Sequence, residues 1–447
     1  MARTAPVRTT ARKATRPVSD DVTRDLTTLQ ESLRRKWAGR SFENLVSEAT
    51  RTLMNARGDW DPPAGITPKQ EPVRLAIGIP DSDTLPKDDL REAASRAIER
   101  PGDAAFSYGF GMGYAKLRSL IAERYAREKG LQVNEDWFQL TNGSAGAIDL
   151  ICRTLIEPGD VIISESPTYM GTLRNFRGVL AEVAAVPMDE DGMIVDELEP
   201  LIERLSAAGK RIKLIYTIST FHNPTGATLS IDRRIRLLEI AAKHDILVLD
   251  DDAYGELYFG DQPPPSLSSL AGGYGVVTVG TLSKTLAPGL RIGWIHGEPE
   301  IVQLFGNMRF AMGLNQLMVR VIADYMEAGR LDNHIERARA LYRTKMETLA
   351  DALEHHAGEF IEFRRPIGGF YLWVNVNKGG LEASAVWRTA FEEGVAFTPG
   401  VNFFADRRDP DGERVRIAFP QTPIERMDEG ARRFGEACRR VAAGKGA

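Results

Sequence analysis

The sequence predicts an α/β protein with a mostly parallel sheet, followed by a smaller α+β domain. From about residue 110 to residue 325, amphipathic helical patterns alternate with short runs rich in Val, Ile and Leu. Most of these runs are apolar on both faces, as expected for strands covered by helices on both sides. After residue 325 a long charged helical stretch precedes short strands separated by Gly and Pro. A chain of 447 residues exceeds what one core usually supports, so two domains are expected.

The chain divides into four predicted segments. Residues 1–35 begin with a stretch rich in Arg, Thr, Ala and Pro, and they are expected to form a disordered or arm-like extension. Residues 36–100 should supply a helix and a linker that close back onto the smaller domain. Residues 101–325 form the predicted large domain, and residues 326–447 form the predicted C-terminal small domain.

Within the large domain, the pattern predicts a helix over residues 114–128, whose apolar stripe contains Leu117, Ile121 and Tyr125. A second helix, over residues 230–244, reads as a crossover between parallel strands. Strands are predicted at residues 160–166, 181–187, 212–219, 245–251, 275–281 and 290–297. In the small domain a helix is expected over residues 331–356, with strands inside residues 361–376, 394–404 and 414–420.

The composition argues against a nucleic-acid-binding, disulfide-rich, metal-binding or membrane-spanning protein. The 57 Lys and Arg against 62 Asp and Glu give a net charge of −5, which provides no general field for binding nucleic acid. The two cysteines, Cys152 and Cys438, are too few for a disulfide framework and fit a reducing cytoplasm. The six histidines lack the spacing of metal ligands, so no metal is expected. No apolar run approaches the roughly 20 residues of a membrane span.

Polar residues gather in loops that follow predicted strands, where α/β sheets carry their ligand sites. Ser144 and Ala145 lie between Gly143 and Gly146 at the start of a helix, whose free N–H groups suit an anion. A plain helix cap with a glycine turn is the alternative. Asn223 follows the strand at residues 212–219, in a segment that could also be only a turn.

Two further loops carry charge. Asp250, Asp251 and Asp252 end an apolar strand, and Tyr254 follows them. These acids could be solvated or capping, but a buried one is costly without a cationic partner. The stretch VGTLSKTLAPGLRIGW, residues 279–294, places Lys284 among hydroxyls and turn residues. A lone loop lysine is usually a surface lysine, but four loops that each fit part of an anionic aromatic cofactor argue against that alternative.

Taken together, these motifs resemble the fold type I pyridoxal-phosphate enzymes, specifically class I/II aminotransferases of the kynurenine and 2-aminoadipate type. The similarity extends from about residue 70 to residue 440 and rests on YGFGMGYAKLRSLIA, LTNGSAGAIDL, PGDVIISESPTY, FHNPTG, DDDAYGEL, TLSKTLAPGLRIGW, GGFYLW and GVAFTPGVNFF. The family also includes MocR-like regulators, whose helix-turn-helix extension we do not expect here. The resemblance implies a large domain with a mostly parallel seven-stranded sheet, a smaller α+β domain and pyridoxal 5′-phosphate as the cofactor.

The resemblance also implies a role for each matching residue. Lys284 matches the Schiff-base lysine, which also moves protons at the substrate. Asp251 matches the acid that faces the pyridine nitrogen and keeps it protonated. Asn223 and Tyr254 match the groups that hydrogen-bond the ring oxygen O3′. Tyr169 matches the aromatic residue stacked on the ring. Lys284, Asp251 and Tyr254 are therefore the implied catalytic residues.

Other matching residues would hold the phosphate and the substrate. The implied phosphate cup consists of Ser144, the amide of Ala145, Thr281, Ser283 and Arg291. Tyr108 matches a tyrosine that reaches the phosphate of the neighbouring subunit, which implies a homodimer with shared active sites. Arg416 matches the arginine that binds the substrate α-carboxylate, with Gly78 beside it and Asn223 nearby. Ala145 departs from the family, which commonly has Gln there. Met312 and Asn315 lie where relatives contribute residues to the substrate pocket.

Transamination between an α-amino acid and a 2-oxo acid is the expected reaction. An arginine that retains the carboxylate favours cleavage of the Cα–H bond over decarboxylation. The same cofactor also supports other reactions, so a specialised enzyme of γ-replacement, carbon–carbon bond formation or oxygen-dependent oxidation remains an alternative. A third alternative is a non-catalytic module that senses the cofactor or an amino acid. Retention of Lys284, Asp251, Tyr254 and Arg416 together counts against it.

Overall fold

The computed structural model describes residues 20–54, 61–100, 102, 104–109, 111–309, 313–410 and 412–446. The chain divides into two compact units, with the boundary in the sequence between Arg51 and Thr52. In the N-terminal unit, helix α1 (Asp20–Trp37) is followed by the start of α2 (Glu48–Met54). The described part of the predicted N-terminal extension is therefore helical from Asp20 to residue 35, and residues 1–19 lie outside the described residues.

The second unit is built on one large sheet. Its strands are β2 (Phe138–Thr141), β3 (Val161–Ser166), β4 (Glu182–Asp189), β5 (Gly192–Met193), β6 (Ile212–Thr217), β7 (Leu247–Asp251), β8 (Val276–Thr281) and β9 (Gly293–His296). They lie in the order β2-β9-β8-β7-β6-β3-β4-β5. Only β5 and β9 run opposite to the other six, because both pair antiparallel with their neighbours. Each predicted strand of the large domain overlaps one of these strands.

The implied number of seven strands is one too few. The eighth strand, β5, has two residues and pairs antiparallel with the end of β4. A tight turn at Asp189–Gly192 folds the chain back on itself, and Gly192 takes a left-handed φ of 95°. Strand β2 has four residues, and the sequence pattern predicted no strand there.

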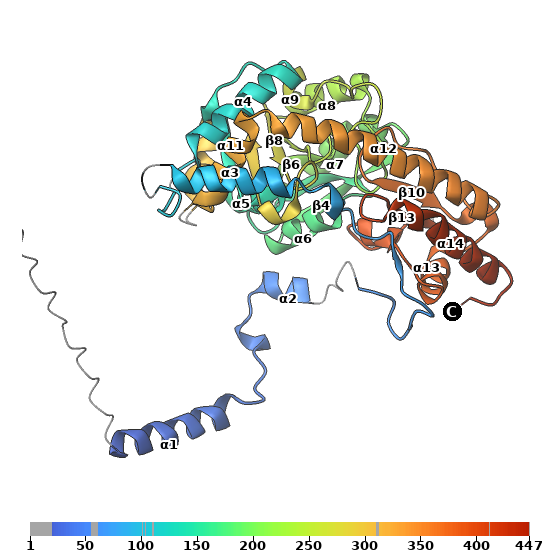
Figure 1. The fold of residues 1–447 in the computed structure, drawn as a ribbon, viewed down its shortest axis with the longest axis horizontal. Coiled ribbons are helices and arrows are strands. Elements are labelled where there is room, and N and C mark those ends of the chain that lie inside the picture. The colour runs from blue at the N-terminus through green and yellow to red at the C-terminus, as the bar shows by residue number, and fades with distance from the viewer. Residues whose placement is uncertain are drawn as a thin grey trace, which may run out of the picture. The chain divides into compact units, whose positions relative to one another are not determined.

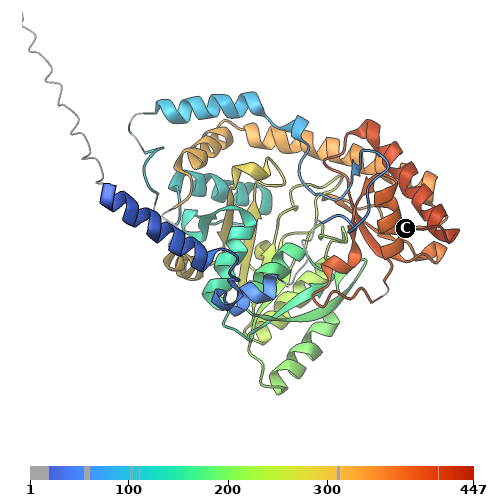
Figure 2. The ribbon, with the colours of Figure 1, turned by 90° about the horizontal axis from the view of Figure 1, so that it is seen from below.

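Helices cover both faces of the sheet (Figures 1 and 2). The helices of this unit are α3 (Lys87–Glu99), α4 (Ala115–Lys129), α5 (Gly143–Leu155), α6 (Met170–Gly178), α7 (Leu198–Ala207), α8 (Ile231–Lys243), α9 (Leu267–Leu270), α10 (Pro299–Met308), α11 (Gln316–Glu327), α12 (Arg330–Ala357), α13 (Ala383–Glu392) and α14 (Met427–Ala442). Alternate strand residues explain the layering. Ile163 and Ile215 pack with α7 and α8, whereas Ile162 and Leu214 pack with α5 and α6.

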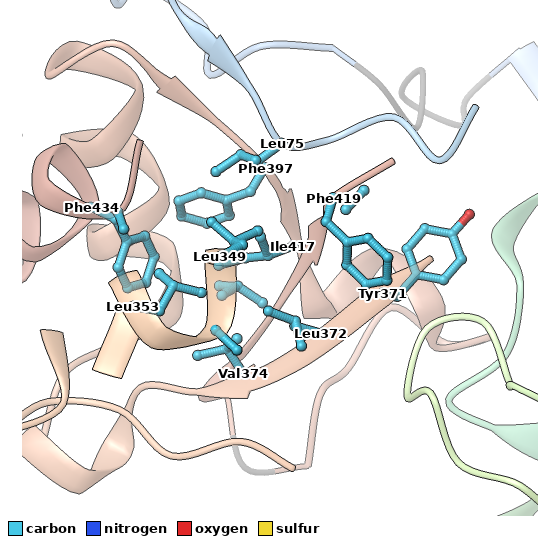
Figure 3. Close-up of a cluster of buried hydrophobic side chains, with 14 of the residues drawn as sticks. Leu75, Leu349, Leu353, Tyr371, Leu372, Val374, Phe397, Ile417, Phe419 and Phe434 are labelled. Carbon is cyan, nitrogen blue, oxygen red and sulfur yellow. The ribbon is translucent and has the colours of Figure 1, made fainter. Parts of the chain in front are cut away.

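The C-terminal elements form a second sheet with its own core. Strands β10 (Tyr371–Asn375), β13 (Arg414–Ala418) and β12 (Thr398–Pro399) are antiparallel, and β13 lies in the middle. Figure 3 shows the core, in which Leu349 and Leu353 of α12 and Phe434 of α14 meet side chains of the sheet. Helix α12 has 28 residues. Its first part packs with α11, and its later part packs in this core.

The segment before α3 forms a separate two-stranded sheet and is hydrogen-bonded to the end of β13. Strand β1 (Val73–Arg74) pairs in parallel with β11 (Val395–Ala396), and Ala418 donates its backbone N–H to the carbonyl of Leu75. Helix α3 instead packs on α11. This arrangement places residues 75–78 beside the end of β13. None of the helices described here is long and apolar enough to cross a membrane.

Candidate functional site

The predicted site residues follow strands whose carboxyl ends share one edge of the large sheet. β3, β6, β7 and β8 are parallel, and β2 runs with them because both it and β8 are antiparallel to β9. Asn223 comes six residues after β6, Asp251 ends β7, and Lys284 comes three residues after β8. The shared edge is where open α/β sheets carry their ligands.

Lys284 is half-buried and already has two contacts. Its Nζ donates a hydrogen bond of 2.7 Å to the carbonyl oxygen of Gly78, and it lies 5.7 Å from the ring centroid of Tyr254. The missing side chain of Gly78 makes room for another residue, Tyr371. A Cβ at Gly78 would lie only 2.0 Å from the hydroxyl oxygen of Tyr371. The structure therefore brings Lys284, Tyr254 and Gly78 together.

The two carboxylate oxygens of Asp251 have different surroundings. Oδ2 accepts a hydrogen bond of 3.0 Å from the hydroxyl of Tyr216. Oδ1 is buried and has no hydrogen-bond partner among the described residues. Burial raises the pKa of Asp251 to about 7, the Tyr216 hydrogen bond opposes that rise, and the charge of Asp250 adds to it. A buried carboxylate oxygen of this kind is suited to an N–H group that carries positive charge.

A cluster of hydroxyl and amide groups lies around Tyr254. The hydroxyl oxygens of Tyr254 and Tyr371 are 2.9 Å apart, and Asn223 Nδ2 donates to the hydroxyl of Tyr371 at 3.4 Å. Burial raises the pKa of Tyr254 well above its ordinary value. Tyr254 therefore remains a neutral hydroxyl that can donate a hydrogen bond at neutral pH.

Arg416 is fully buried in β13 and is aimed at the same cluster. Its Nη1 donates 2.9 Å to Asn223 Oδ1, and its Nη2 donates 2.7 Å to the Ala76 carbonyl and 3.2 Å to the hydroxyl of Thr398. The guanidinium carbon lies 4.4 Å from the ring centroid of Tyr371. Burial lowers the pKa of Arg416 because desolvation disfavours its charge. An incoming carboxylate would compensate that cost.

The start of α5 and Arg291 form the end of the site predicted to hold an anion. Arg291 Nη2 donates 3.0 Å to the carbonyl of Asn142, and a Cβ on Gly143 would lie 2.6 Å from the same nitrogen. Ser144 and Ala145 occupy the first turn of α5, where backbone N–H groups have no partner within the helix.

The loop after β8 completes this end. The hydroxyl of Thr281 donates 2.9 Å to Ser283 Oγ and accepts from the backbone N–H of Ser283 at 3.1 Å. These bonds fix the turn that leads directly into Lys284. Thr281 and Ser283 are both buried, so the turn is a defined part of the interior rather than a surface loop.

The remaining predicted residues lie at the margin of this arrangement. Tyr169 is the residue immediately before α6, and its ring fills the space beside Gly171, where a Cβ would lie 2.6 Å from ring atoms. Tyr108 is 74% exposed, and its implied contact with a neighbouring subunit stays a prediction. Asn315 caps α11, accepting from the N–H of Met318. Met312 lies outside the described residues.

An open cavity of about 820 Å³ flanks the start of α5. It has a mixed lining: Thr141, Asn142, Gly146, Asp149, Leu150, Arg153, Gly289, Leu290, Arg291, Met308, Arg309, Gly313, Leu314, Asn315 and Met318. Arg291 lines this cavity and also contacts the start of α5 through the carbonyl of Asn142. In the part of the chain that the structure describes, no group of three or more His, Cys, Asp or Glu side chains is arranged to hold a metal ion.

Sequence reasoning missed three residues of this site. Tyr371 is part of the GGFYLW motif but had been given no role, although its hydroxyl contacts both Tyr254 and Asn223. Thr398 was missed because only strand pairing places it opposite Arg416. Tyr216 was missed because it lies inside an apolar strand. A hydroxyl in the middle of such a strand was the available signal, since a buried hydroxyl needs a partner.

Known proteins with similar sequences include aminotransferases. The family model described as "Aminotransferase class I and II" matches residues 70–434. Among curated proteins, the aromatic-amino-acid aminotransferase 1 of Thermococcus litoralis is 34% identical over 366 residues, covering 81% of this chain and 87% of that protein. The 2-aminoadipate transaminase of Thermus thermophilus is 34% identical over 371 residues, covering 82% and 89%.

Among solved structures, the α-aminoadipate aminotransferase LysN of Thermus thermophilus aligns with a TM-score of 0.80 at 31% identity. The alignment covers 90% of this chain and all of that one. That protein was crystallised in complex with N-(5′-phosphopyridoxyl)-L-leucine, a phosphopyridoxyl group joined to an amino acid.

Proposed function

Since the chain belongs to the class I and II aminotransferases, we propose that the edge of the sheet around Lys284 is its active site. The protein is a pyridoxal-phosphate-dependent aminotransferase, which transfers the amino group of an α-amino acid to a 2-oxo acid. One observation carries the assignment of the site. The amine of Lys284, the ring of Tyr254 and Asp251 Oδ1, which has no partner among the described residues, lie at or just after strand ends on the same sheet edge.

The residues present fit pyridoxal phosphate. Oδ1 of Asp251 is a buried acceptor without a protein donor among the described residues, as the ring nitrogen requires. The first turn of α5 and Arg291 offer N–H donors for the phosphate. Asn223 and Tyr254 offer donors for the ring oxygen, and Tyr169 offers an aromatic face.

When bound, the cofactor supplies an electron sink that stabilises negative charge at the substrate Cα. The protein supplies the proton transfer. We assign this transfer to Lys284, whose amine is held 2.7 Å from the Gly78 carbonyl oxygen and lies 5.7 Å from the ring centroid of Tyr254. Asp251 is assigned to hold the proton on the ring nitrogen, because a carboxylate beside that nitrogen stabilises its positive charge.

Arg416 is assigned to the α-carboxylate of the substrate. Its two terminal nitrogens are held by Asn223, Ala76 and Thr398, so the plane of the guanidinium is fixed before the substrate arrives. A fixed fork recognises a carboxylate through two parallel hydrogen bonds. Asn223 contacts Arg416 and Gly78 contacts Lys284, and we assign both to the proposed substrate site.

We further propose a homodimer with shared active sites and a cytoplasmic location. Tyr108 is exposed, and Leu304 and Met308 of α10 are exposed apolar side chains, with Met308 lining the cavity beside the phosphate end. A second copy of the chain would cover these groups and bring its own Tyr108 to the site. Cys152 and Cys438 are buried and unbridged, which supports a reducing compartment.

The assignment of Lys284 is tested by the visible absorption spectrum of the protein. Purified protein supplied with pyridoxal phosphate should absorb in the visible, and Lys284→Ala should abolish that band. Lys210→Ala, which changes a half-exposed lysine paired with Glu182, is the matched control and should keep it. Retention of the same band in Lys284→Ala would refute the assignment.

The reaction is tested with a panel of amino acids that includes aromatic ones and 2-aminoadipate, the classes named for the two curated relatives. With 2-oxoglutarate as acceptor, the expected products are glutamate and the 2-oxo acid of the donor, followed by mass spectrometry. Consumption of oxygen or formation of a replacement product, without glutamate, would contradict the proposed reaction.

A further inference from the structure

Asp251 is hydrogen-bonded to a buried residue, Tyr216, which is not part of the proposed active site. Tyr216 lies on β6 opposite Leu249 of β7, so its side chain is on the same face of the sheet as that of Asp251, two residues further along β7. Its hydroxyl donates to Oδ2 at 3.0 Å. Oδ1, by contrast, has no partner among the residues described. Oδ2 is therefore hydrogen-bonded to the protein, while Oδ1 remains available to a ligand.

Tyr216 is itself held in place. Its side chain is fully buried, and its ring packs edge-on against Phe176 of α6 at a centroid distance of 5.4 Å. Its hydroxyl oxygen also lies 3.0 Å from Oγ1 of Thr172. A tyrosine has one hydroxyl proton, and Tyr216 uses it to donate its hydrogen bond to Asp251. The hydroxyl of Thr172 must then donate to Tyr216, which sets the direction of the chain Thr172 to Tyr216 to Asp251.

Thr172 is linked to the site through α6. It lies in the first turn of that helix, and its backbone N–H donates to the carbonyl of Tyr169 at 3.1 Å. Tyr169 is the residue proposed to stack on the cofactor ring. The same helical turn therefore supports the face of the ring and, through Tyr216, the acid at its nitrogen.

We propose that Thr172 and Tyr216 are positioning residues that hold Asp251 with Oδ2 occupied and Oδ1 presented to the ring nitrogen of the cofactor. This inference rests on the proposed function, because it concerns the same acid. Neither residue touches the reacting atoms. Their effect is on the orientation and charge of a group that does.

The charges around Asp251 explain why such support matters. Burial raises the pKa of Asp251, and the charges of its chain neighbours Asp250, on β7, and Asp252, just after β7, raise it further. Tyr216 on β6 has the largest opposing effect, and Lys284 after β8 has a smaller one. Asp252 is itself paired with Lys129 of α4. Burial keeps the pKa of Tyr216 well above its ordinary value, so it remains a donor throughout the working pH range.

The test compares Tyr216→Phe and Thr172→Val with Tyr325→Phe. Tyr325 is a fully buried tyrosine of α11 whose hydroxyl has no hydrogen-bond partner among the described residues, so Tyr325→Phe is a matched control. Two properties are measured without turnover. One is the dissociation constant of pyridoxal phosphate between pH 6 and pH 9. The other is the ¹⁵N chemical shift of the ring nitrogen in protein loaded with labelled cofactor, which reports its protonation.

Tyr216→Phe should weaken cofactor binding about 10-fold at pH 7.5, because a hydrogen bond to a charged group is lost. The ring nitrogen should also lose its proton at a lower pH than in the wild type. Thr172→Val should shift both properties in the same direction by a smaller factor, and Thr172→Ser should restore them. Tyr325→Phe should match the wild type.

Wild-type values of both properties in Tyr216→Phe, with unchanged melting temperature, would overturn the inference. If Tyr216→Phe lowers the melting temperature far below that of Tyr325→Phe, the Thr172→Val and Thr172→Ser pair decides, and equal values in those two would overturn it as well. Failure of the proposed function has a different signature: the wild type would then lack the visible band that depends on Lys284.

Discussion

Asp251 is the residue at which burial and charge conflict most directly. With a pKa of about 7 instead of its ordinary 3.8, the carboxyl binds its proton more tightly in the folded than in the unfolded chain. The free energy of unfolding of the cofactor-free protein should therefore fall as pH rises from about 4 to about 7. The cofactor reverses this cost because its ring nitrogen brings a positive charge to Oδ1.

Asp251→Asn should stabilise the cofactor-free protein at pH 8, by on the order of 4 kcal/mol, since a shift of one pKa unit corresponds to about 1.4 kcal/mol. The same change should weaken cofactor binding. Urea unfolding at pH 4, 6 and 8 measures the first effect, and the two proteins should converge at pH 4. An equal difference at all three values would show that the charge of Asp251 is not its cause.

Arg416 provides a second prediction at this scale. Arg416→Ala should raise the apparent KM for the amino acid strongly, with a loss of about 2 to 5 kcal/mol, because a buried charged pair loses one partner. Arg416→Lys should restore little, since an ammonium cannot form two parallel bonds. Arg343→Ala, which removes an exposed arginine paired with Glu347, is the control. Steady-state kinetics with the visible band monitored in parallel would reveal whether the cofactor site is intact.

At the scale of elements, the site depends on a short segment that is not part of the large sheet. Residues 75–78 are held by the pairing of β1 with β11 and by the bond from Ala418 to Leu75. This segment presents the carbonyl of Ala76 to Arg416 and the carbonyl of Gly78 to Lys284. It therefore connects the group proposed to bind the substrate with the group proposed to move its proton.

Gly78→Ala tests this connection. The new Cβ would lie 2.0 Å from the hydroxyl of Tyr371, so either the segment or the tyrosine must move. We expect kcat/KM to fall roughly 100-fold, as displacements of about 1 Å can do, with a small change in melting temperature. Gly260→Ala is the control, because nothing lies within 4 Å of the position of its Cβ. Equal kinetics for both variants would contradict the role given to the segment.

The sequence predicted the elements of the large sheet better than the contacts between them. Periodicity located six of its strands, and the loops after β6, β7 and β8 were recognised from residues that an apolar strand end does not need. β2 and β5 were missed because four and two residues carry too little periodicity. Tyr371 and Tyr216 were missed for another reason: their partners lie 117 and 35 positions away along the chain, and only the folded sheet brings them together.

At the scale of the whole molecule, the proposed homodimer makes a prediction that no single chain can fulfil. Neither Lys284→Ala nor Tyr108→Phe alone should have wild-type activity. When the two variants are unfolded and refolded together, a mixed dimer should regain one complete site, with Lys284 from one chain and Tyr108 from the other. Mixed dimers, separated by tags, should reach about half the wild-type activity per dimer. Activity no greater than that of the two parents would argue against shared sites.

The bond from Arg416 to Ala76 joins residues 340 positions apart, and that from Lys284 to Gly78 joins residues 206 positions apart. Contacts of this kind close long loops and form only when distant parts of the chain are both in place. On the ribosome, the strands and loops up to Lys284 emerge more than 130 residues before Arg416 does. A nascent chain that has not yet reached Arg416 therefore lacks the group proposed to recognise the substrate, however completely its large sheet has formed.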